Sequence, residues 1–301
     1  MHRLFLFACL SFFIISLNAQ KKSPTDTIPF TLSTHNNIIV QSIINNQDTV
    51  DLMFHTASDL MTLTEEATIR MSNLKFSEPD SIQSWGGGGT ARFSEGNVLQ
   101  IGELRWDSLE IVENKYSGPG TDGKFGLSFF TGKIVEINFD RRVIILHEDL
   151  PSIADRYERL DLSGSSVFWF LEGQSRIEDS ALTNRFLIHT GYGGTILYDD
   201  EFSNQNDLGK QLKTVSEKEL KDAYGNVLKT KKSILPYFSI GEQTFQDLAV
   251  SFFEGSIGRQ KMSVIGGDLL KRFNIILDVE HSHIYLKANE LMDVEYTDAE
   301  K

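Results

Sequence analysis

An internal duplication constrains the fold of this 301-residue chain more than any other feature of its sequence. Phe125–Asp140 runs from a glycine turn through a short apolar stretch into a β-rich run, and Ile265–Glu280 repeats that order without a gap. Upstream of each copy, Leu52–Ser58 and Phe186–Tyr192 are apolar strands followed by His, Thr and a small residue. Such internal similarity indicates two copies of one structural unit. The sequence therefore predicts two homologous lobes that face each other.

Short runs of β-branched and aromatic residues, separated by turn residues, predict a mostly β protein. These runs are Ile28–Leu32, Asn37–Ile43, Thr49–Phe54, Lys133–Phe139 and Asn274–Val279. Turn chemistry at Asn45–Asp48 predicts a hairpin between the second and third runs. Helical patterns are few and short, around Glu65–Leu74 and Asp268–Phe273.

The segment Met1–Ala19 has the pattern of a secretory signal peptide. The basic residue Arg3 precedes an apolar run, Leu4–Leu17, and the small residue Ala19 marks the expected cleavage position. This run is shorter than the about 20 apolar residues that cross a membrane, and no second run of that length follows. We therefore expect an exported chain without a membrane span, in the periplasm or secreted.

Composition excludes several classes of function. Cys9 is the only cysteine and lies in the predicted signal peptide, so we expect no disulfide, thiolate nucleophile or cysteine metal site. The formal net charge of −13, without a clustered Lys/Arg stripe, argues against nucleic acid as a partner. Stability must come from apolar cores, and we expect one lobe over residues 25–150 and the other over 165–290, joined near Pro151–Gly164.

The order of the motifs resembles that of aspartic proteases of the pepsin and retropepsin type. Each half has an apolar strand ending in x-Thr-small, then a flap region, then a glycine turn and a hydrophobic hairpin. The sequence is most similar to bacterial aspartyl proteases with tandem retropepsin-like lobes, over about residues 25–290. The resemblance implies two homologous, mostly β lobes with an inter-lobe cleft. In that family an Asp-Thr/Ser-Gly motif in each lobe brings two aspartates together, which share one proton and hold the attacking water.

The resemblance places His55 and His189 at the positions of the family's two catalytic aspartates. It also implies that Thr56 and Thr190, which follow them, cross-link the two loops by hydrogen bonds. The glycine of the motif is present in the second lobe as Gly191. In the first lobe Ala57 replaces it, which shifts that loop if the position has a positive φ.

A pair of histidines cannot perform the aspartic mechanism. A neutral imidazole has one donor and one acceptor nitrogen in place of two acceptor oxygens, and two adjacent imidazoles resist double protonation. The nearby acids Asp59, Asp199 and Asp200 match no dyad position. We therefore expect a pseudoenzyme, an aspartic-type endopeptidase by resemblance that does not cleave peptides by that mechanism.

Several interpretations of the histidine pair stay open. The pair is a degenerate active site in which neighbouring groups satisfy each imidazole, or it binds Zn²⁺ or Cu²⁺, for which imidazoles are common ligands. No third ligand at suitable spacing is evident. A third interpretation makes one histidine a general base that activates water. A fourth is a structural protein of the cell envelope with a vestigial cleft.

The leading hypothesis is binding of an extended peptide or protein segment in the cleft, without a cofactor. The alternative is a metal-binding protein or metal-dependent hydrolase with His55 and His189 as ligands. Ser84–Thr90 falls where the family has its flap, although the same stretch fits a flexible surface loop. Ala223–Asn226 is the corresponding turn of the second lobe, although it equally fits a plain hairpin turn. The predicted substrate-binding residues are Thr56, Ala57, Trp85, Gly86, Thr190 and Gly191.

Overall fold

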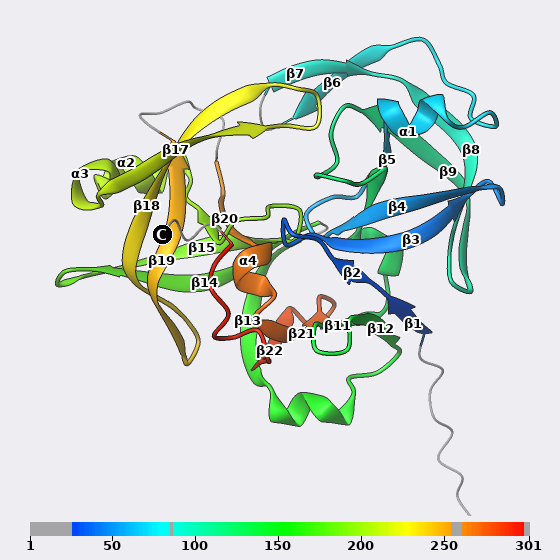
Figure 1. The fold of residues 1–301 in the computed structure, drawn as a ribbon. Coiled ribbons are helices and arrows are strands. Elements are labelled where there is room, and N and C mark those ends of the chain that lie inside the picture. The colour runs from blue at the N-terminus through cyan, green and yellow to red at the C-terminus, as the bar shows by residue number, and fades with distance from the viewer. Residues whose placement is uncertain (1–25, 85–86, 166, 254–260, 298–301) are drawn as a thin grey trace, which may run out of the picture.

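The structure is a computed structural model that describes residues 26–84, 87–165, 167–253 and 261–297. The described chain forms a 13-stranded sheet, a seven-stranded sheet and a two-stranded sheet, with only short helices. Figure 1 shows the two lobes side by side above a common base. The predicted mostly β, two-lobed fold is confirmed. The predicted signal peptide, Met1–Ala19, lies outside the described residues, and so do Trp85 and Gly86.

The first half of the chain supplies the seven-stranded sheet, the two-stranded sheet and part of the base. Its elements are β1 (Asp26–Pro29), β2 (Thr31–Leu32), β3 (Ile38–Ile44), β4 (Asp48–His55), β5 (Met61–Thr64), α1 (Glu65–Ile69), β6 (Asp80–Ser84), β7 (Gly87–Ala91), β8 (Phe93–Ile101), β9 (Leu104–Asn114), β10 (Gly123–Gly126), a 3₁₀ helix (Leu127–Phe130), β11 (Ile134–Asn138) and β12 (Val143–His147). The seven strands follow the order β2-β3-β4-β10-β5-β9-β8, and β3 also pairs with β8. This extra pairing curls the sheet back on itself like a barrel.

The second half supplies most of the 13-stranded sheet. Its elements are a 3₁₀ helix (Ser152–Arg156), β13 (Glu158–Ser165), β14 (Phe168–Ile177), β15 (Ser180–His189), β16 (Ile196–Leu197), α2 (Asp200–Gln205), α3 (Leu208–Gln211), β17 (Thr214–Lys221), β18 (Val227–Ile240), β19 (Gln243–Phe253), β20 (Ser263–Gly266), α4 (Gly267–Leu270), β21 (Phe273–Asp278) and β22 (His283–Ala288). The order is β1-β12-β11-β21-β22-β13-β14-β15-β20-β16-β19-β18-β17. In this order β17 is an outer strand.

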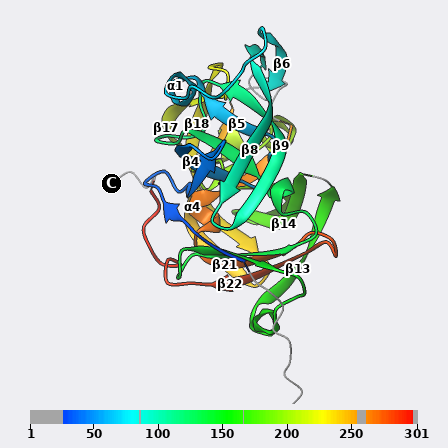
Figure 2. The same ribbon diagram turned by 90° about the vertical axis from the view of Figure 1, so that its right-hand side faces the viewer.

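The base of the molecule joins the two copies of the duplicated segment. Strands β11 and β21 pair antiparallel, and Glu136 lies directly opposite Ile276, its counterpart in the second copy. The turned view in Figure 2 shows β13, β21 and β22 together below the rest of the molecule. Pairing of equivalent positions relates the two halves by an approximate twofold axis through the base. That symmetry brings the equivalent ends of β4 and β15 toward each other.

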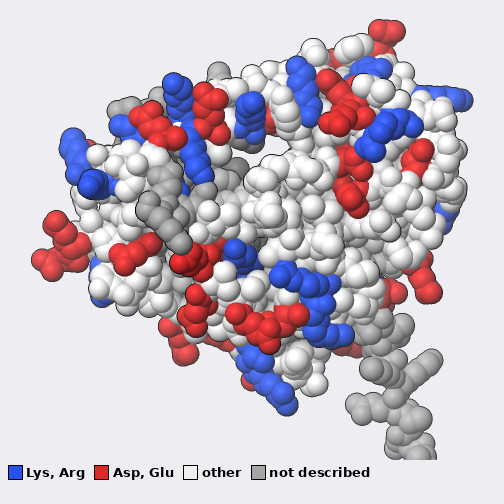
Figure 3. Space-filling model, in the orientation of Figure 1, with Lys and Arg blue, Asp and Glu red and all other residues white. Residues whose placement is uncertain are grey.

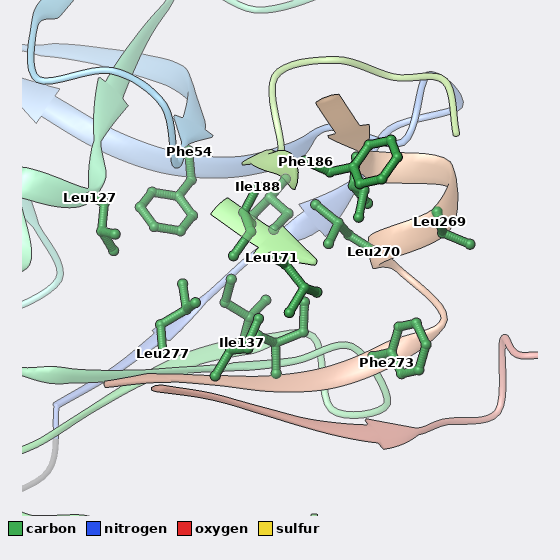
Figure 4. Packing of buried hydrophobic residues seen from close by; sticks show 14 of the residues in the cluster. Phe54, Leu127, Ile137, Leu171, Phe186, Ile188, Leu269, Leu270, Phe273 and Leu277 are labelled. Atoms are coloured by element: carbon green, nitrogen blue, oxygen red, sulfur yellow. The ribbon is translucent and has the colours of Figure 1, made fainter. Parts of the chain in front are cut away.

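A continuous apolar core connects the base to the strands above it. Ile137 of β11 and Leu277 of β21 pack in the same cluster as Ile188, which precedes the end of β15, and Phe54, which precedes the end of β4. All four are buried, and Figure 4 shows their side chains in this cluster. Burial of large apolar side chains stabilises each by roughly 1.5–3 kcal/mol relative to exposure. The strand ends at the lobe interface are therefore held by rigid packing.

Most predicted local elements are present, with shorter helices than expected. The predicted hairpin is formed by β3 and β4, and its turn residues Asn45 and Asn46 both have positive φ, which asparagine tolerates. The expected helix at Glu65–Leu74 ends at Ile69 as α1. The expected helix at Asp268–Phe273 is the single turn α4, because strand β21 begins at Phe273. The sequence analysis did not foresee α2 and α3. Within the described ranges, no helix has the length and apolar character needed to traverse a bilayer.

Two equivalent glycines allow the chain to cross close behind the strand ends. A Cβ at Gly126 would overlap the carbonyl oxygen of Ser58, and one at Gly266 would overlap the carbonyl oxygens of Tyr192 and Gly194. In both halves the loop that follows the His-Thr motif therefore packs directly on a glycine. This contact explains the glycines of the duplicated motif.

We expect Gly126→Ala to destabilise the protein by at least about 3 kcal/mol, because the backbone at Ser58 cannot yield without moving the loop after His55. Gly209→Ala is the control, since a Cβ there would lie 3.7 Å from Phe252 in ordinary contact. In α3 this control should stabilise by up to about 1 kcal/mol. Urea unfolding measures both, and equal stabilities would contradict the packing argument.

Candidate functional site

The candidate site lies where β4 and β15 end at the interface between the lobes. His55 is the last residue of β4 and pairs with Gly126 of β10, and His189 is the last residue of β15 and pairs with Gly266 of β20. Their imidazole ring centroids are 4.4 Å apart, with 56° between the ring planes. The structure thus brings together the two histidines that the sequence analysis singled out.

Reciprocal hydrogen bonds between two buried threonines lock the two strand ends together. The Thr56 N–H donates to Thr190 Oγ1 at 3.0 Å, and the Thr190 N–H donates to Thr56 Oγ1 at 3.1 Å. Each hydroxyl in turn donates across the interface, Thr56 to the Ile188 carbonyl and Thr190 to the Phe54 carbonyl, both at 2.7 Å. Every polar group of this cross-link is paired with the opposite lobe, so the spacing of the imidazoles is fixed.

Two asparagines in the loop before β3 add a second tie between the lobes. Asn37 Nδ2 donates to the Thr190 carbonyl at 3.2 Å, and Asn36 Nδ2 donates to the Gly193 carbonyl at 2.8 Å. Asn36 Oδ1 accepts from Lys271 Nζ at 2.8 Å. Sequence reasoning missed both asparagines as site residues, because Asn37 begins a predicted strand run and neither residue lies in a motif that indicates a site. Asn36 does have a positive φ of 63°.

The small residues after the threonines have different roles. A Cβ at Gly191 would overlap Cδ2 and Nε2 of His55, so the first imidazole packs directly on that glycine. Neither Ala57 nor Gly191 has a positive φ. Alanine at position 57 therefore causes no backbone strain, and the loop shift considered for a positive-φ position does not arise.

Hydrogen bonds define which ring nitrogens face the site. Ala57 N–H donates to His55 Nδ1 at 3.2 Å, so the neutral imidazole of His55 carries its proton on Nε2. His189 Nδ1 is buried and has no hydrogen-bond partner among the described residues. The Nε2 atoms of His55 and His189 also form no hydrogen bond within the described ranges.

Burial and positive charge keep the imidazoles neutral at pH 7. The pKa of His55 lies well below its usual 6.5, chiefly because of burial and then because of His189 and Lys124. The pKa of His189 falls to about 4, through burial and the charge of Lys124. Lys124 lies on β10, and burial lowers the pKa of its own ammonium. Sequence reasoning did not assign Lys124 to the site, and the only signal for it is a charged residue between Gly123 and Phe125.

The acids considered in the sequence serve other roles. Asp199 accepts from the Ser263 hydroxyl at 2.6 Å and caps α2 through the Phe202 N–H at 2.7 Å. Asp59 is exposed, and Asp200 lies in the first turn of α2. Among the described residues, no carboxylate contributes to the pKa shifts of His55 or His189.

The donor set at the pair does not fit a zinc or copper site. Zinc sites use three or four protein ligands, whereas His55 and His189 offer two nitrogens. In the described part of the chain, no group of three or more His, Cys, Asp or Glu residues is placed to hold a metal ion. The charge of Lys124, which acts on both imidazoles, would also repel a dication.

Backbone contacts between the two lobes also occur at the turn between β17 and β18. The turn Ala223–Asn226 joins β17 to β18, and the Ala223 carbonyl accepts from the N–H groups of Lys115 at 2.8 Å and Tyr116 at 3.2 Å in the first lobe. Figure 1 shows this hairpin reaching the β6–β7 hairpin, and Figure 3 shows the surface hollowed beneath them. A hairpin turn is therefore present at Ala223–Asn226. We call this contact between the lobes the roof.

Further contacts join the two hairpins of the roof. Ser84 donates its hydroxyl to Asp222, and Asn226 Nδ2 donates to the Gly88 carbonyl at 3.5 Å. Tyr224 packs on Gly89, where a Cβ would lie only 2.9 Å from the tyrosine Cβ. The predicted flap residues Trp85 and Gly86 belong to this region of the sequence but lie outside the described residues.

Two surface cavities lie away from the pair. One of about 250 Å³ is lined by residues of α2, α3 and β19, including Ser203 and Phe252, and by Asp207 between the two helices. The other, of about 450 Å³, lies between the start of β19 and residues 292–296. Neither cavity is lined by His55 or His189.

Comparison with known proteins identifies the fold. No protein-family model matches the chain, and no curated protein matches it. Among solved structures, the crystal structure of the aspartic proteinase from Irpex lacteus is similar, with a TM-score of 0.56 and 13% sequence identity, covering 92% of this chain and 99% of that one. The chain thus has the bilobal fold of a pepsin-like aspartic proteinase, as the motif order implied. At this identity the likeness shows the fold alone.

We expect Thr56→Val to destabilise the protein by about 2–4 kcal/mol, because it leaves the buried Thr190 N–H and Ile188 carbonyl unpaired. Thr56→Ser keeps the hydroxyl and should cost about 1 kcal/mol or less. Urea unfolding monitored by circular dichroism measures both. Similar losses for the two variants would show that the methyl group, not the cross-link, matters.

The lowered pKa of His189 predicts a loss of stability in acid. The folded-state pKa of about 4 lies below the unfolded value of 6.5, so unfolding takes up a proton between these pH values. Stability from this group is fully present above pH 6.5 and falls, by up to about 3 kcal/mol in total, as the pH drops to 4. His189→Asn should flatten the pH dependence of the unfolding free energy across that window.

Protonation of other groups also lowers the stability of the protein in acid. The unfolding free energies of the wild-type and His189→Asn proteins are therefore compared at each pH. His281→Asn is the control, because His281 is exposed and its pKa is raised by its hydrogen bond with Asp278. This control should keep the acid loss of the wild type. A difference between His189→Asn and wild type that is constant from pH 7.5 to 4 would refute the pKa assignment.

Proposed function

We propose that this chain is an exported pseudoenzyme that binds an extended peptide or protein segment in the inter-lobe cleft without cleaving it by the aspartic mechanism. One observation carries the proposal. A pepsin-like scaffold keeps its threonine cross-link intact, while the side chains held at the strand ends are the imidazoles of His55 and His189. We infer that these two residues replace the catalytic aspartates. Export rests on the apolar run at Leu4–Leu17.

The chemistry of the pair supports the absence of aspartic catalysis. That mechanism needs two adjacent carboxylates, one of which keeps a proton because like charges cannot both ionise. Here desolvation keeps both imidazoles unprotonated at pH 7, and no described carboxylate acts on them. A base with a pKa of about 4, as for His189, is also a poor proton acceptor for water at neutral pH.

The strand edges around the cleft support peptide binding. Strand β17 is an outer strand of the large sheet, and β6 and β7 form a two-stranded sheet of their own. Outer strands present backbone N–H and C=O groups that an extended segment can pair with, while side-chain pockets provide specificity. These edges belong to the two hairpins of the roof. A peptide lying between the roof and the histidine pair would contact both lobes.

Cleavage and binding assays on matched variants test this function. The wild type should cleave no member of a fluorogenic peptide library between pH 3 and 7.5 in a pepstatin-sensitive way. Peptides that bind should raise its melting temperature, because a ligand of the folded state stabilises it. The variant with both His55→Asp and His189→Asp should gain pepstatin-sensitive cleavage if the rest of the cleft is preserved.

Single variants, His55→Asp alone and His189→Asp alone, are the controls and should remain inactive because one carboxylate cannot form the pair. Pepstatin-sensitive cleavage by the wild type would overturn the proposal. A second result would also overturn it: no peptide raises the melting temperature, and the purified protein contains stoichiometric zinc or copper. That second result would favour a metal protein.

A further inference from the structure

The floor of the cleft carries three nitrogen bases and no described acid. His55, His189 and Lys124 come from three different strands, β4, β15 and β10. Lys124 lies two residues before Gly126, which pairs with His55, and its charge acts on both imidazoles. Within the described ranges, the Lys124 ammonium forms no hydrogen bond or ion pair at contact distance. A desolvated cation without a close partner is costly, so this group is poised for an anionic ligand.

The hydrogen-bond donors of this floor point to the same chemistry. The Ala57 N–H occupies Nδ1 of His55, which leaves the Nε2–H of that ring as a donor. Nε2 of His189 also has no partner within the described part of the chain. One donor from His55 and three from an ammonium suit the two oxygens of a carboxylate, which accept several hydrogen bonds.

Asp222, the acid whose charge acts on Lys124, is already hydrogen-bonded to groups of the roof. Asp222 is buried and accepts from the N–H groups of Tyr224 at 3.0 Å and Asn226 at 2.7 Å, and also from Ser84. Its charge raises the pKa of Lys124, but it contributes to neither imidazole shift. The hydrogen bonds of Asp222 are thus made within its turn and to Ser84, and it acts on Lys124 through its charge alone.

We propose that His55, His189 and Lys124 form a carboxylate-binding subsite, which receives an acidic side chain or the terminal carboxylate of a bound peptide. This inference rests on the proposed peptide-binding function and specifies its ligand class. The charge of this site is the reverse of the charge of a carboxylate pair. A floor of two carboxylates repels acidic residues, whereas this floor of imidazoles and an ammonium attracts them.

Binding of a carboxylate at this floor takes up protons. The negative charge stabilises the imidazolium form of His55 or His189 and offsets the opposing charge of Lys124. The charge of Asp222, which lies just after β17, acts on Lys124 in the opposite direction and raises the pKa of its ammonium. Affinity should therefore rise as the pH falls from 7.5 to 5.5, while the ligand carboxylate, with an ordinary pKa near 4, stays ionised.

Four probes test the subsite by calorimetry on the full chain. They are an acetylated, amidated peptide with a central glutamate, the same peptide with glutamine, the glutamine peptide with a free terminal carboxylate, and acetate alone. We expect at least one carboxylate peptide to bind about tenfold tighter than the amidated glutamine peptide, as a charge-assisted hydrogen bond provides. The two carboxylate peptides distinguish a side-chain source from a terminal one.

Matched lysine variants localise the effect. Lys124→Met keeps an apolar stem and should abolish the preference for carboxylate, whereas Lys210→Met removes an exposed lysine on α3 and should keep it. Lys124→Gln serves as a second variant if the methionine protein does not fold. Histidine ring resonances in the wild type should shift on addition of acetate or a carboxylate peptide.

The possible outcomes distinguish failure of the carboxylate subsite from failure of peptide binding. Equal affinity for glutamate, free-carboxylate and amidated glutamine peptides would overturn the subsite but leave peptide binding standing. Acetate that shifts the histidine resonances, with no peptide bound, would support the subsite and remove the peptide function. If no probe binds, both fail. Retention of the carboxylate preference in Lys124→Met would also overturn the subsite.

Discussion

The reciprocal hydrogen bonds between Thr56 and Thr190 are the constraint on which the site depends. They join the ends of two strands that belong to different lobes, and each threonine bonds both the backbone N–H and a carbonyl of the other loop. Because all of these groups are buried, separating the lobes would leave each one unpaired. The 4.4 Å spacing of the two imidazoles follows directly from this lock.

The threonine cross-link also fixes the two side chains that set the charge of the site, His55 and His189. Acidic residues in the dyad would need one shared proton, whereas His55 and His189 stay neutral through burial and the field of Lys124. His55 packs on Gly191, and neither Ala57 nor Gly191 has a positive φ, so the ring is accommodated without backbone strain at these positions. The pepsin-like fold thus holds two imidazoles at the ends of β4 and β15.

Much of the architecture could be predicted from the sequence. The duplication predicted two lobes, and the pairing of Glu136 with its counterpart Ile276 in the base is its structural expression. Strand runs and the Asn45–Asn46 turn are local patterns, which is why they were recognised correctly. The helices were less predictable, because the start of β21 at Phe273 limits α4 to a single turn.

By itself, the sequence determined that two apolar strands each end in His-Thr-small, since alternation and turn chemistry are written in neighbouring residues. Only the tertiary structure decided what surrounds those ends. Local sequence gives no sign that Lys124, Asn37 and Asp222 belong to a site. Lys124 is brought there by the parallel pairing of β10 with β4, Asn37 by its hydrogen bond to the Thr190 carbonyl, and Asp222 by the contacts of the roof. The physical reason is that charges and hydrogen bonds act through space. The number of residues between two positions in the sequence does not give the distance between them in the folded protein.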